Sequence, residues 1–246
     1  MRRILITVQY LGANFNGVQA QKDESKITVQ GVLEDAIQKV LQTKPTIYFS
    51  GRLDGGVSAL ALPAHFDINS EIELDKLQFA TNNYLPDYIQ VTSIKEVPLT
   101  FHARYDAKEK TYRYTMYVSR WVEPFLHRDA MQLYKEPSVE LMKEGAKFLV
   151  GKHDFSAFMS KNSSIKGTVR TIKFLNIEQK GNVITVEVCG DGFLYNMVRI
   201  IVGTLLNVGY SKYEPQMVKS ILEGKVRKNA GKMVEAKGLC LIDVKY

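Results

Sequence analysis

The order in which strand-like and helix-like patterns alternate along the first hundred residues constrains the fold more than any other feature. Short β-branched and aromatic runs predict strands, and apolar residues that recur every three or four positions predict amphipathic helices. Thr28 directly precedes the first helical stretch, where a threonine can cap a helix. The predicted elements are strands at 4–10, 46–50, 64–68 and 88–97 and helices at 29–41 and 74–81. This β-α-β-β-α-β order is typical of a ferredoxin-like (split βαβ) unit, an antiparallel sheet with helices on one face.

The rest of the chain repeats this order loosely, without a sequence repeat, a low-complexity segment or a flexible linker. Residues 98–102 mark the junction. We therefore expect an α+β protein with two ferredoxin-like halves, 1–100 and 101–246, that share one continuous structure. The predicted elements of the second half are strands at 110–118, 168–179, 183–189 and 239–246 and helices at 138–150, 193–208 and after Pro215.

Charge and cysteine content narrow the class of protein. Lys and Arg outnumber Asp and Glu by 33 to 26, and the resulting net charge of +7 favours a polyanionic partner, most simply a nucleic acid. Two cysteines and four scattered histidines form neither a disulfide framework nor a pattern typical of a zinc site. No signal peptide is visible, and the most apolar run, 197–208, is interrupted by Arg199 and is too short to cross a bilayer. We expect a cytoplasmic, soluble protein with reduced cysteines and no metal.

Residues 51–58 contain the strongest candidate for a reactive group. The strand predicted at 46–50 leads into Gly51-Arg52-Leu53-Asp54-Gly55-Gly56-Val57-Ser58, where one carboxylate lies between an arginine and two glycines. Glycines enter positive φ freely and carry no side chain, so the pattern predicts that Asp54 lies on a turn that a large substrate can approach closely. Such a position suits a nucleophile. An ordinary Asp-Gly turn is the alternative interpretation.

A tyrosine pair in the strand predicted at 110–118 is a second candidate. Alternation along a strand places Tyr112 and Tyr114 on one face and Arg113 on the other. Tyrosines on an open sheet face beside basic side chains can stack unpaired bases. Plain packing within the sheet is the alternative.

Two basic features complete the candidates. Arg199 lies among apolar residues at the start of a long predicted helix, and a buried arginine needs a partner, most naturally a carboxylate. An arginine that reaches the surface along its aliphatic stem is the alternative. The segment that contains Lys161, Lys166 and Arg170 is typical of a loop that contacts phosphates, and equally of a solvated surface loop.

Taken together, these motifs resemble the bacterial tRNA pseudouridine synthase A (TruA) family, in order and over essentially the whole chain. That family's central motif is Gly-Arg-Thr-Asp-Ala-Gly-Val-His, of which this chain keeps Gly51, Arg52, Asp54, Gly56 and Val57. Further matching blocks are Tyr10 with Gly12, Phe15, Gly17 and Gln19, then Val29-Gln30, His65-Phe66, Asn82 with Leu85-Pro86, Phe101-His102-Ala103-Arg104, Tyr112-Arg113-Tyr114, Thr168-Val169-Arg170, Met197-Val198-Arg199 and Gly238-Leu239.

The chain also departs from the family pattern, beside the predicted catalytic loop and in the long polar loop at 11–27. The departures are Leu53 for Thr, Gly55 for Ala, Ser58 for His, Leu11 for Asp, Val18 for Trp and Leu62-Pro63 for Gln-Val. They bear on target choice and rate, and the chain resembles a somewhat diverged member.

The resemblance implies a reaction that breaks the N1–C1′ glycosidic bond of uridine, turns the uracil and rejoins it through C5, with no cofactor and no metal. Asp54 would attack the sugar or the base, or remove a sugar proton; the sequence does not choose among these routes. The other implied roles are Arg199 as the cation facing Asp54, Tyr112 stacked on the uracil, Arg52 holding the target nucleotide out of its stem, and Lys161, Lys166 and Arg170 on phosphates.

The family fold joins the sheets of two ferredoxin-like halves around a central cleft, and its members act as homodimers on tRNA. The implied substrate is uridine at positions 38 to 40 of the anticodon stem-loop. Two alternatives stay open at this point. The first is the same chemistry on another RNA, such as rRNA or another tRNA site. The second is an RNA-binding or RNA-folding paralogue that has lost catalysis.

Overall fold

The computed structural model describes residues 1–23, 25–160 and 167–246, which form two compact units. The first unit comprises residues 1–108 with 240–246, and the second comprises 109–239. The sequence places the division at residue 100 instead. Residues 101–108 stay with the first unit because its strands bind them: the Arg3 guanidinium donates to the Phe101 carbonyl at 2.8 Å, and the Lys108 N–H donates to the Lys245 carbonyl at 2.8 Å.

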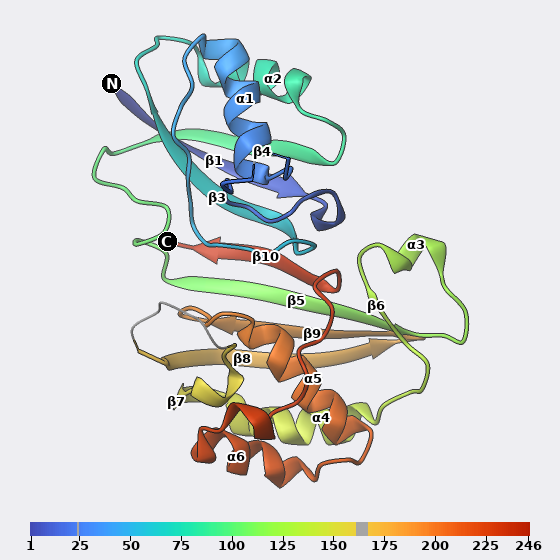
Figure 1. Ribbon diagram of the computed structural model, residues 1–246. Coiled ribbons are helices and arrows are strands. Elements are labelled where there is room, and N and C mark those ends of the chain that lie inside the picture. The colour runs from blue at the N-terminus through green and yellow to red at the C-terminus, as the bar shows by residue number, and fades with distance from the viewer. Residues whose placement is uncertain (24, 161–166) are drawn as a thin grey trace. The chain divides into compact units, whose positions relative to one another are not determined.

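The first unit has the predicted β-α-β-β-α-β order (Figure 1). Its elements are β1 (Arg2–Tyr10), the short 3₁₀ helix η1 (Gly12–Asn14), α1 (Val29–Leu41), β2 (Tyr48–Phe49), β3 (Ser58–Ile68), α2 (Leu74–Tyr84) and β4 (Ile89–Val97). The strands β4, β1 and β3 are adjacent and antiparallel, and β2 pairs with β3. The last strand of the chain, β10 (Leu239–Lys245), runs parallel to the start of β3 through two paired residues.

The first helix shows how local sequence builds this unit. The Thr28 hydroxyl accepts a hydrogen bond from the Gly31 N–H at 3.2 Å, which caps α1 as predicted. The helix ends where Gln42 adopts the left-handed conformation, at φ 57°. Its apolar stripe, Val29, Leu33 and Ile37, is almost completely buried.

The second unit contributes its own strands and three longer helices that pack against one another, α4 with both α5 and α6 (Figure 1). Its strands are β5 (Glu109–Val118), β6 (Met131–Leu133), β7 (Gly151–Asp154), β8 (Val169–Lys180) and β9 (Val183–Gly190), and its helices are α3 (Pro124–His127), α4 (Val139–Ala146), α5 (Met197–Gly209) and α6 (Pro215–Gly224). The sheet order is β5-β9-β8-β7, all antiparallel, and β6 lies parallel to the end of β5. Three further 3₁₀ turns are η2 (Lys147–Leu149), η3 (Ser156–Phe158) and η4 (Arg227–Asn229).

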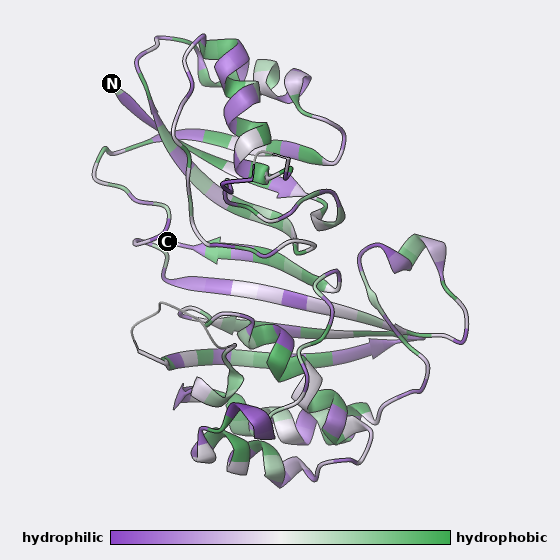
Figure 2. Ribbon diagram, viewed as in Figure 1, coloured by the Kyte–Doolittle hydropathy of each residue, from purple (hydrophilic) through white to green (hydrophobic). Residues whose placement is uncertain are grey.

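Helix α5 is the core of the second unit. Every residue of α5 except Asn207 is buried, including Arg199, and Figure 2 shows the helix mostly in the hydrophobic colour. The helix starts at Met197 and not at the predicted residue 193, because Asn196 takes a left-handed conformation with φ 62°. Within the described residues, no helix is both long and apolar enough to cross a membrane.

The first unit contains a buried histidine whose surroundings disfavour its protonated form. His65 on β3 is 2% exposed, and its Nδ1 accepts a hydrogen bond from the Ala103 N–H at 3.2 Å. Burial, reinforced by the neighbouring His102 and Arg3, lowers the pKa of His65 to about 4, although Asp67 acts in the opposite direction. The imidazole is therefore neutral in the folded protein at neutral pH.

This histidine should make the first unit sensitive to acid. In the unfolded chain, His65 binds a proton below its ordinary pKa of about 6.5, whereas in the folded chain it does so only below about pH 4. The free energy of unfolding therefore falls as the pH drops from 6.5 to 4. Lowering the pH from 7 to 5 should cost about 2 kcal/mol. Urea unfolding at both pH values, followed by circular dichroism, measures the loss. His65→Asn should lose less than wild type over this step, and His153→Asn, a histidine of the second unit, should behave as wild type. Equal losses in wild type and His65→Asn would contradict the assignment.

Candidate active site

Asp54 lies on a loop between β2 and β3 that a second loop holds in place. The polar segment at 11–27, which follows β1, runs alongside the Asp54 loop, and Gly17 and Asp54 form an isolated antiparallel bridge. The Val18 N–H donates to the Leu53 carbonyl at 3.1 Å, and the Gly56 N–H donates to the Phe15 carbonyl at 3.3 Å. Within the Asp54 loop itself, the Val57 N–H donates to the Asp54 carbonyl at 3.2 Å, which closes the predicted turn. Backbone hydrogen bonds therefore fix residues on both sides of the carboxylate.

Glycines allow the two loops to approach this closely. A Cβ on Gly12 would lie 2.3 Å from the Val57 carbonyl carbon and 2.6 Å from that of Gly56, distances that no side chain tolerates. Gly17 has φ +116°, and a Cβ there would meet the Leu53 carbonyl oxygen at 3.1 Å. The loop at 11–27 is consequently a structural support for Asp54.

The departures from the family motif have structural places in this support. The Ser58 hydroxyl is buried and accepts a hydrogen bond from the Gly12 N–H at 2.9 Å. Leu53 and Val18 are both buried apolar residues on the two facing loops. Phe15, which matches the family pattern, lies edge-on to Tyr10 and Tyr88, with ring centroids 5.4 and 5.5 Å apart.

Around the carboxylate, exposure is uneven. Asp54 is half-buried, whereas Arg52 and Gly55 on either side are exposed. Because Arg52 and Gly55 are exposed, a large ligand can reach the loop beside the carboxylate.

In the second unit, Arg199 is held in a defined orientation. Its Nε donates to the Val234 carbonyl at 2.8 Å, and an Nη donates to the Asn196 Oδ1 at 3.1 Å. The Asn196 amide in turn donates to the Ser160 hydroxyl at 3.0 Å. The guanidinium is therefore buried and hydrogen-bonded, which rules out the alternative of an arginine that extends into solvent.

The acceptor of Arg199 is itself fixed by close packing. A Cβ on Gly203 of α5 would lie 1.9 Å from the Lys232 carbonyl oxygen, so only glycine lets segment 231–234 run against the helix. The Thr204 hydroxyl accepts a hydrogen bond from the Gly231 N–H at 2.9 Å on the same side. No sequence pattern predicts the role of segment 231–234, because its contacts with α5 join residues more than 25 positions apart.

The predicted basic loop is described only in part. Lys161 and Lys166 lie outside the described residues. The Arg170 guanidinium, on β8, donates to the carbonyl of the preceding residue, Val169, at 2.6 Å. Its Nε would lie 3.7 Å from a Cβ on Gly192, which is in the loop that leads to α5. Arg170 thus belongs to the same end of the second unit as Asn196, whose partner Ser160 borders the loop.

The two tyrosines of β5 have different environments. Tyr114 is completely buried, and its hydroxyl donates to the Glu235 carbonyl at 2.8 Å, which is a packing role. Tyr112 is 8% exposed and lies edge-on to Phe193, with centroids 5.2 Å apart. Arg113 points to the other face, as predicted, where it pairs with Glu187 at 2.9 Å.

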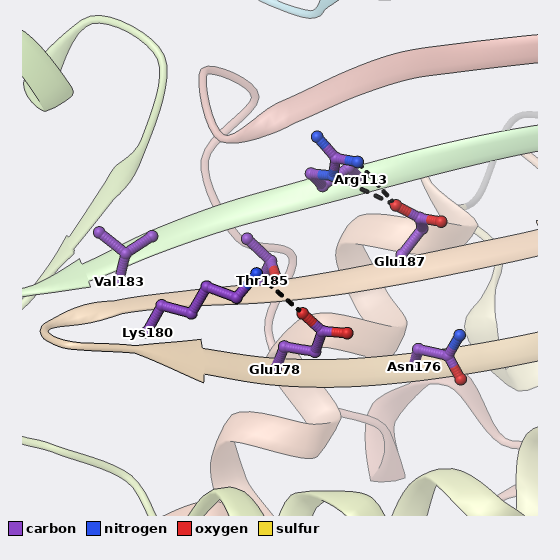
Figure 3. A pocket seen from close by; sticks show the side chains of 7 residues that line it. All are labelled: Arg113, Asn176, Glu178, Lys180, Val183, Thr185 and Glu187. Carbon is purple, nitrogen blue, oxygen red and sulfur yellow. Dashed lines mark hydrogen bonds and ion pairs between the residues drawn. The ribbon is translucent and has the colours of Figure 1, made fainter.

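A cavity of about 330 Å³ lies on the face of the sheet that carries Arg113, and its charged lining residues form ion pairs with one another (Figure 3). Arg113 pairs with Glu187, and Lys180 pairs with Glu178 at 3.7 Å. Because cations and carboxylates are matched, this cavity offers no net charge to a polyanion. The lining residues are Arg113, Asn176, Glu178, Lys180, Val183, Thr185 and Glu187.

A second cavity, of about 550 Å³, lies between η2, β7 and α6 and has a basic lining. Its four lysines, Lys147, Lys152, Lys219 and Lys225, face two carboxylates. Lys225 pairs with Asp154 at 3.0 Å. A phosphate backbone is the kind of ligand that such a groove attracts. Sequence reasoning missed it because the four lysines are spread over nearly 80 residues.

Among the described residues, no group of three or more His, Cys, Asp or Glu side chains is placed to hold a metal ion. The candidate groups that the structure does describe are a supported carboxylate, a buried guanidinium and aromatic rings.

The close approach of Gly12 to the Asp54 loop generates a stability prediction. Gly12→Ala must push the two loops apart, and we expect it to cost at least about 2 kcal/mol, a value typical of steric overpacking. Gly224→Ala is the matched control, because a Cβ there meets nothing within 4 Å. Thermal unfolding of both variants measures the difference. A Gly12→Ala protein as stable as the control would show that the loops are not packed as described.

Comparison with known proteins gives one consistent family. The model of the family described as tRNA pseudouridine synthase matches residues 6–106 and 146–246. A protein of Clostridium botulinum (strain Alaska E43) named tRNA pseudouridine synthase A is 46% identical over 251 residues, and one of Acetivibrio thermocellus with the same name is 41% identical over 246 residues; each match covers all of both chains. A solved Cbf5-Nop10-Gar1 complex is similar with a TM-score of 0.39 and 14% identity, over 99% of this chain and 58% of that chain. By its sequence relatives, this chain belongs to the tRNA pseudouridine synthase A family, isomerases that act on RNA.

Proposed function

We propose that this enzyme converts uridine to pseudouridine at positions 38 to 40 of the tRNA anticodon stem-loop. The N1–C1′ bond breaks, the uracil turns, and a C5–C1′ bond forms while C5 loses its proton and N1 gains one. Atoms and electrons balance within the nucleotide, so the reaction needs no co-substrate. The observation that carries the proposal is the Asp54 loop, a half-buried carboxylate supported on both sides by backbone hydrogen bonds.

Asp54 is the proposed nucleophile and Arg199 its counter-charge. An ionised carboxylate enclosed by substrate loses the stabilisation of water, and a facing cation compensates for that loss. Arg199 suits this role because two hydrogen bonds orient its guanidinium, at 2.8 and 3.1 Å. A guanidinium keeps its charge even when buried, as Arg199 is.

Tyr112 and Arg52 are the proposed contacts to the target nucleotide. The edge of Phe193 fixes the Tyr112 ring, which limits its motion and favours a stacking role against a uracil. Arg52 is exposed two residues before Asp54, where it can hold a flipped nucleotide. Moving a base out of its stem costs a few kcal/mol, which such contacts would offset.

Basic side chains of the second unit would hold the phosphates of the stem. Arg170 with Lys161 and Lys166 is one proposed set, and the lysine-lined groove between η2, β7 and α6 is another. Contacts of this kind orient RNA without reading its sequence. By the same family resemblance, we propose a cytoplasmic homodimer whose subunits both touch one tRNA.

The proposed reaction predicts tritium release from an anticodon stem-loop labelled at C5 of uridines 38 to 40. Wild-type protein should release tritium from this RNA and not from one that carries cytidine at those positions. Asp54→Asn should release none while its affinity for the stem-loop changes less than about threefold, because the nucleophile is not the main source of binding. A filter-binding assay measures that affinity.

Each other outcome has a distinct meaning. Tritium release only from rRNA, or from another part of tRNA, would contradict the anticodon assignment. If the wild-type protein releases tritium from no RNA tested, a binding protein without catalysis is favoured. Release that persists in Asp54→Asn would overturn the role of Asp54.

A further inference from the structure

Four aromatic rings form a ladder in the first unit, apart from the Asp54 and Arg199 contacts. The Tyr48 ring is stacked on the buried His65 ring, with centroids 5.2 Å apart and planes 21° apart. His65 lies 4.8 Å from His102, and His102 lies 4.3 Å from Tyr105. The inner two members are histidines, and the outer two are tyrosines.

The inner rings are fixed by backbone hydrogen bonds. The His65 Nδ1 accepts from the Ala103 N–H at 3.2 Å, and the His102 Nδ1 accepts from the Arg104 N–H at 3.1 Å. The Tyr246 hydroxyl donates to the Ala103 carbonyl at 2.8 Å, which ties the chain end to the same segment. The ladder therefore has a rigid interior.

The outer rings are exposed to solvent. Tyr48 is 50% exposed and Tyr105 is 76% exposed, so neither contributes mainly to a core. The exposed Arg104 lies over Tyr105, with its guanidinium carbon 5.9 Å from the ring centroid. Large aromatic surfaces with a fixed backing and an adjacent cation are what single-stranded nucleic acid binds, since a base stacks on the ring and a phosphate meets the charge.

The position of the ladder relates it to Asp54. Tyr48 precedes Asp54 by six residues within the same compact unit, so their Cα atoms are no more than about 20 Å apart. A nucleotide stacked on Tyr48 would therefore be close enough to Asp54 to belong to the same stem-loop as the target uridine.

We propose that Tyr48 and Tyr105 form a stacking platform for an unpaired base of the substrate RNA, near but distinct from the target uridine. The proposal rests on the proposed function and extends it. It assigns to residues 101–105 a role in holding the loop of the RNA and to Arg104 a contact with its phosphate. A base held there would help to keep the loop open for the target nucleotide to leave its stack.

The test uses an anticodon stem-loop with 2-aminopurine in place of a loop adenine, a fluorescent base that is quenched when it stacks. Wild-type protein should quench it. Tyr105→Ala should restore fluorescence and weaken binding by about tenfold, the loss typical of one stacked base. Tyr105→Phe should behave as wild type, because the ring and not the hydroxyl makes the contact. Tyr84→Ala is the matched control, since Tyr84 is 52% exposed in the same unit, with the Lys39 ammonium 5.3 Å from its ring centroid.

Salt dependence separates stacking from charge. Tyr105→Ala should leave the slope of log affinity against log salt unchanged, and Arg104→Ala should reduce its magnitude by about 0.7. Quenching and affinity in Tyr105→Ala equal to those of wild type would overturn the platform. If wild-type protein fails to bind the stem-loop, the proposed function fails separately, and a single-stranded oligonucleotide with the same fluorescent base then tests the platform by the same criteria.

Discussion

The close approach of residues 12–18 to the Asp54 loop is the contact on which the rest of the proposed site depends. A free loop with three glycines between residues 51 and 56 would sample many conformations and would not hold its carboxylate in one place. Here the backbone hydrogen bonds from Val18 and Gly56, together with the Ser58 hydroxyl, remove that freedom. The backbone that carries Asp54, the proposed nucleophile, is therefore ordered before RNA binds, which would reduce the cost of binding and of reaching a reactive geometry.

In the second unit, hydrogen bonds likewise hold a cation, Arg199, in one orientation. Burying a guanidinium is costly unless its N–H groups are hydrogen-bonded, and Arg199 meets this requirement with a backbone carbonyl and with Asn196. The left-handed Asn196 both starts α5 and orients the arginine, and Gly203 admits the segment that supplies the carbonyl. Helix α5 and segment 231–234 thus hold Arg199 in place, as residues 12–18 hold the Asp54 loop.

How much the sequence predicts follows from how far apart the interacting residues lie. Elements with strong periodicity, such as α1 and the β8–β9 hairpin, and the turn at Asp54 follow from neighbouring residues, and the structure confirms them. The short β6, β7 and α3 were missed because three or four residues show no period. Three features join segments that are distant in the sequence, so no local pattern predicts them. They are the hydrogen bond from Arg199 to Val234, the lysine-lined groove between η2, β7 and α6, and the ladder of aromatic rings.

The pH dependence of the reaction tests the proposed partnership of Asp54 and Arg199 most directly. If Arg199 keeps the carboxylate ionised, Arg199→Met should move the acid limb of the kcat/KM profile for tritium release to higher pH by about one unit. Asn196→Ala, which removes one hydrogen bond that orients Arg199, should move it less. Arg113→Met, which breaks an ion pair on the opposite face of the sheet, is the control and should leave the limb in place. An acid limb that stays where it is in Arg199→Met would contradict the account.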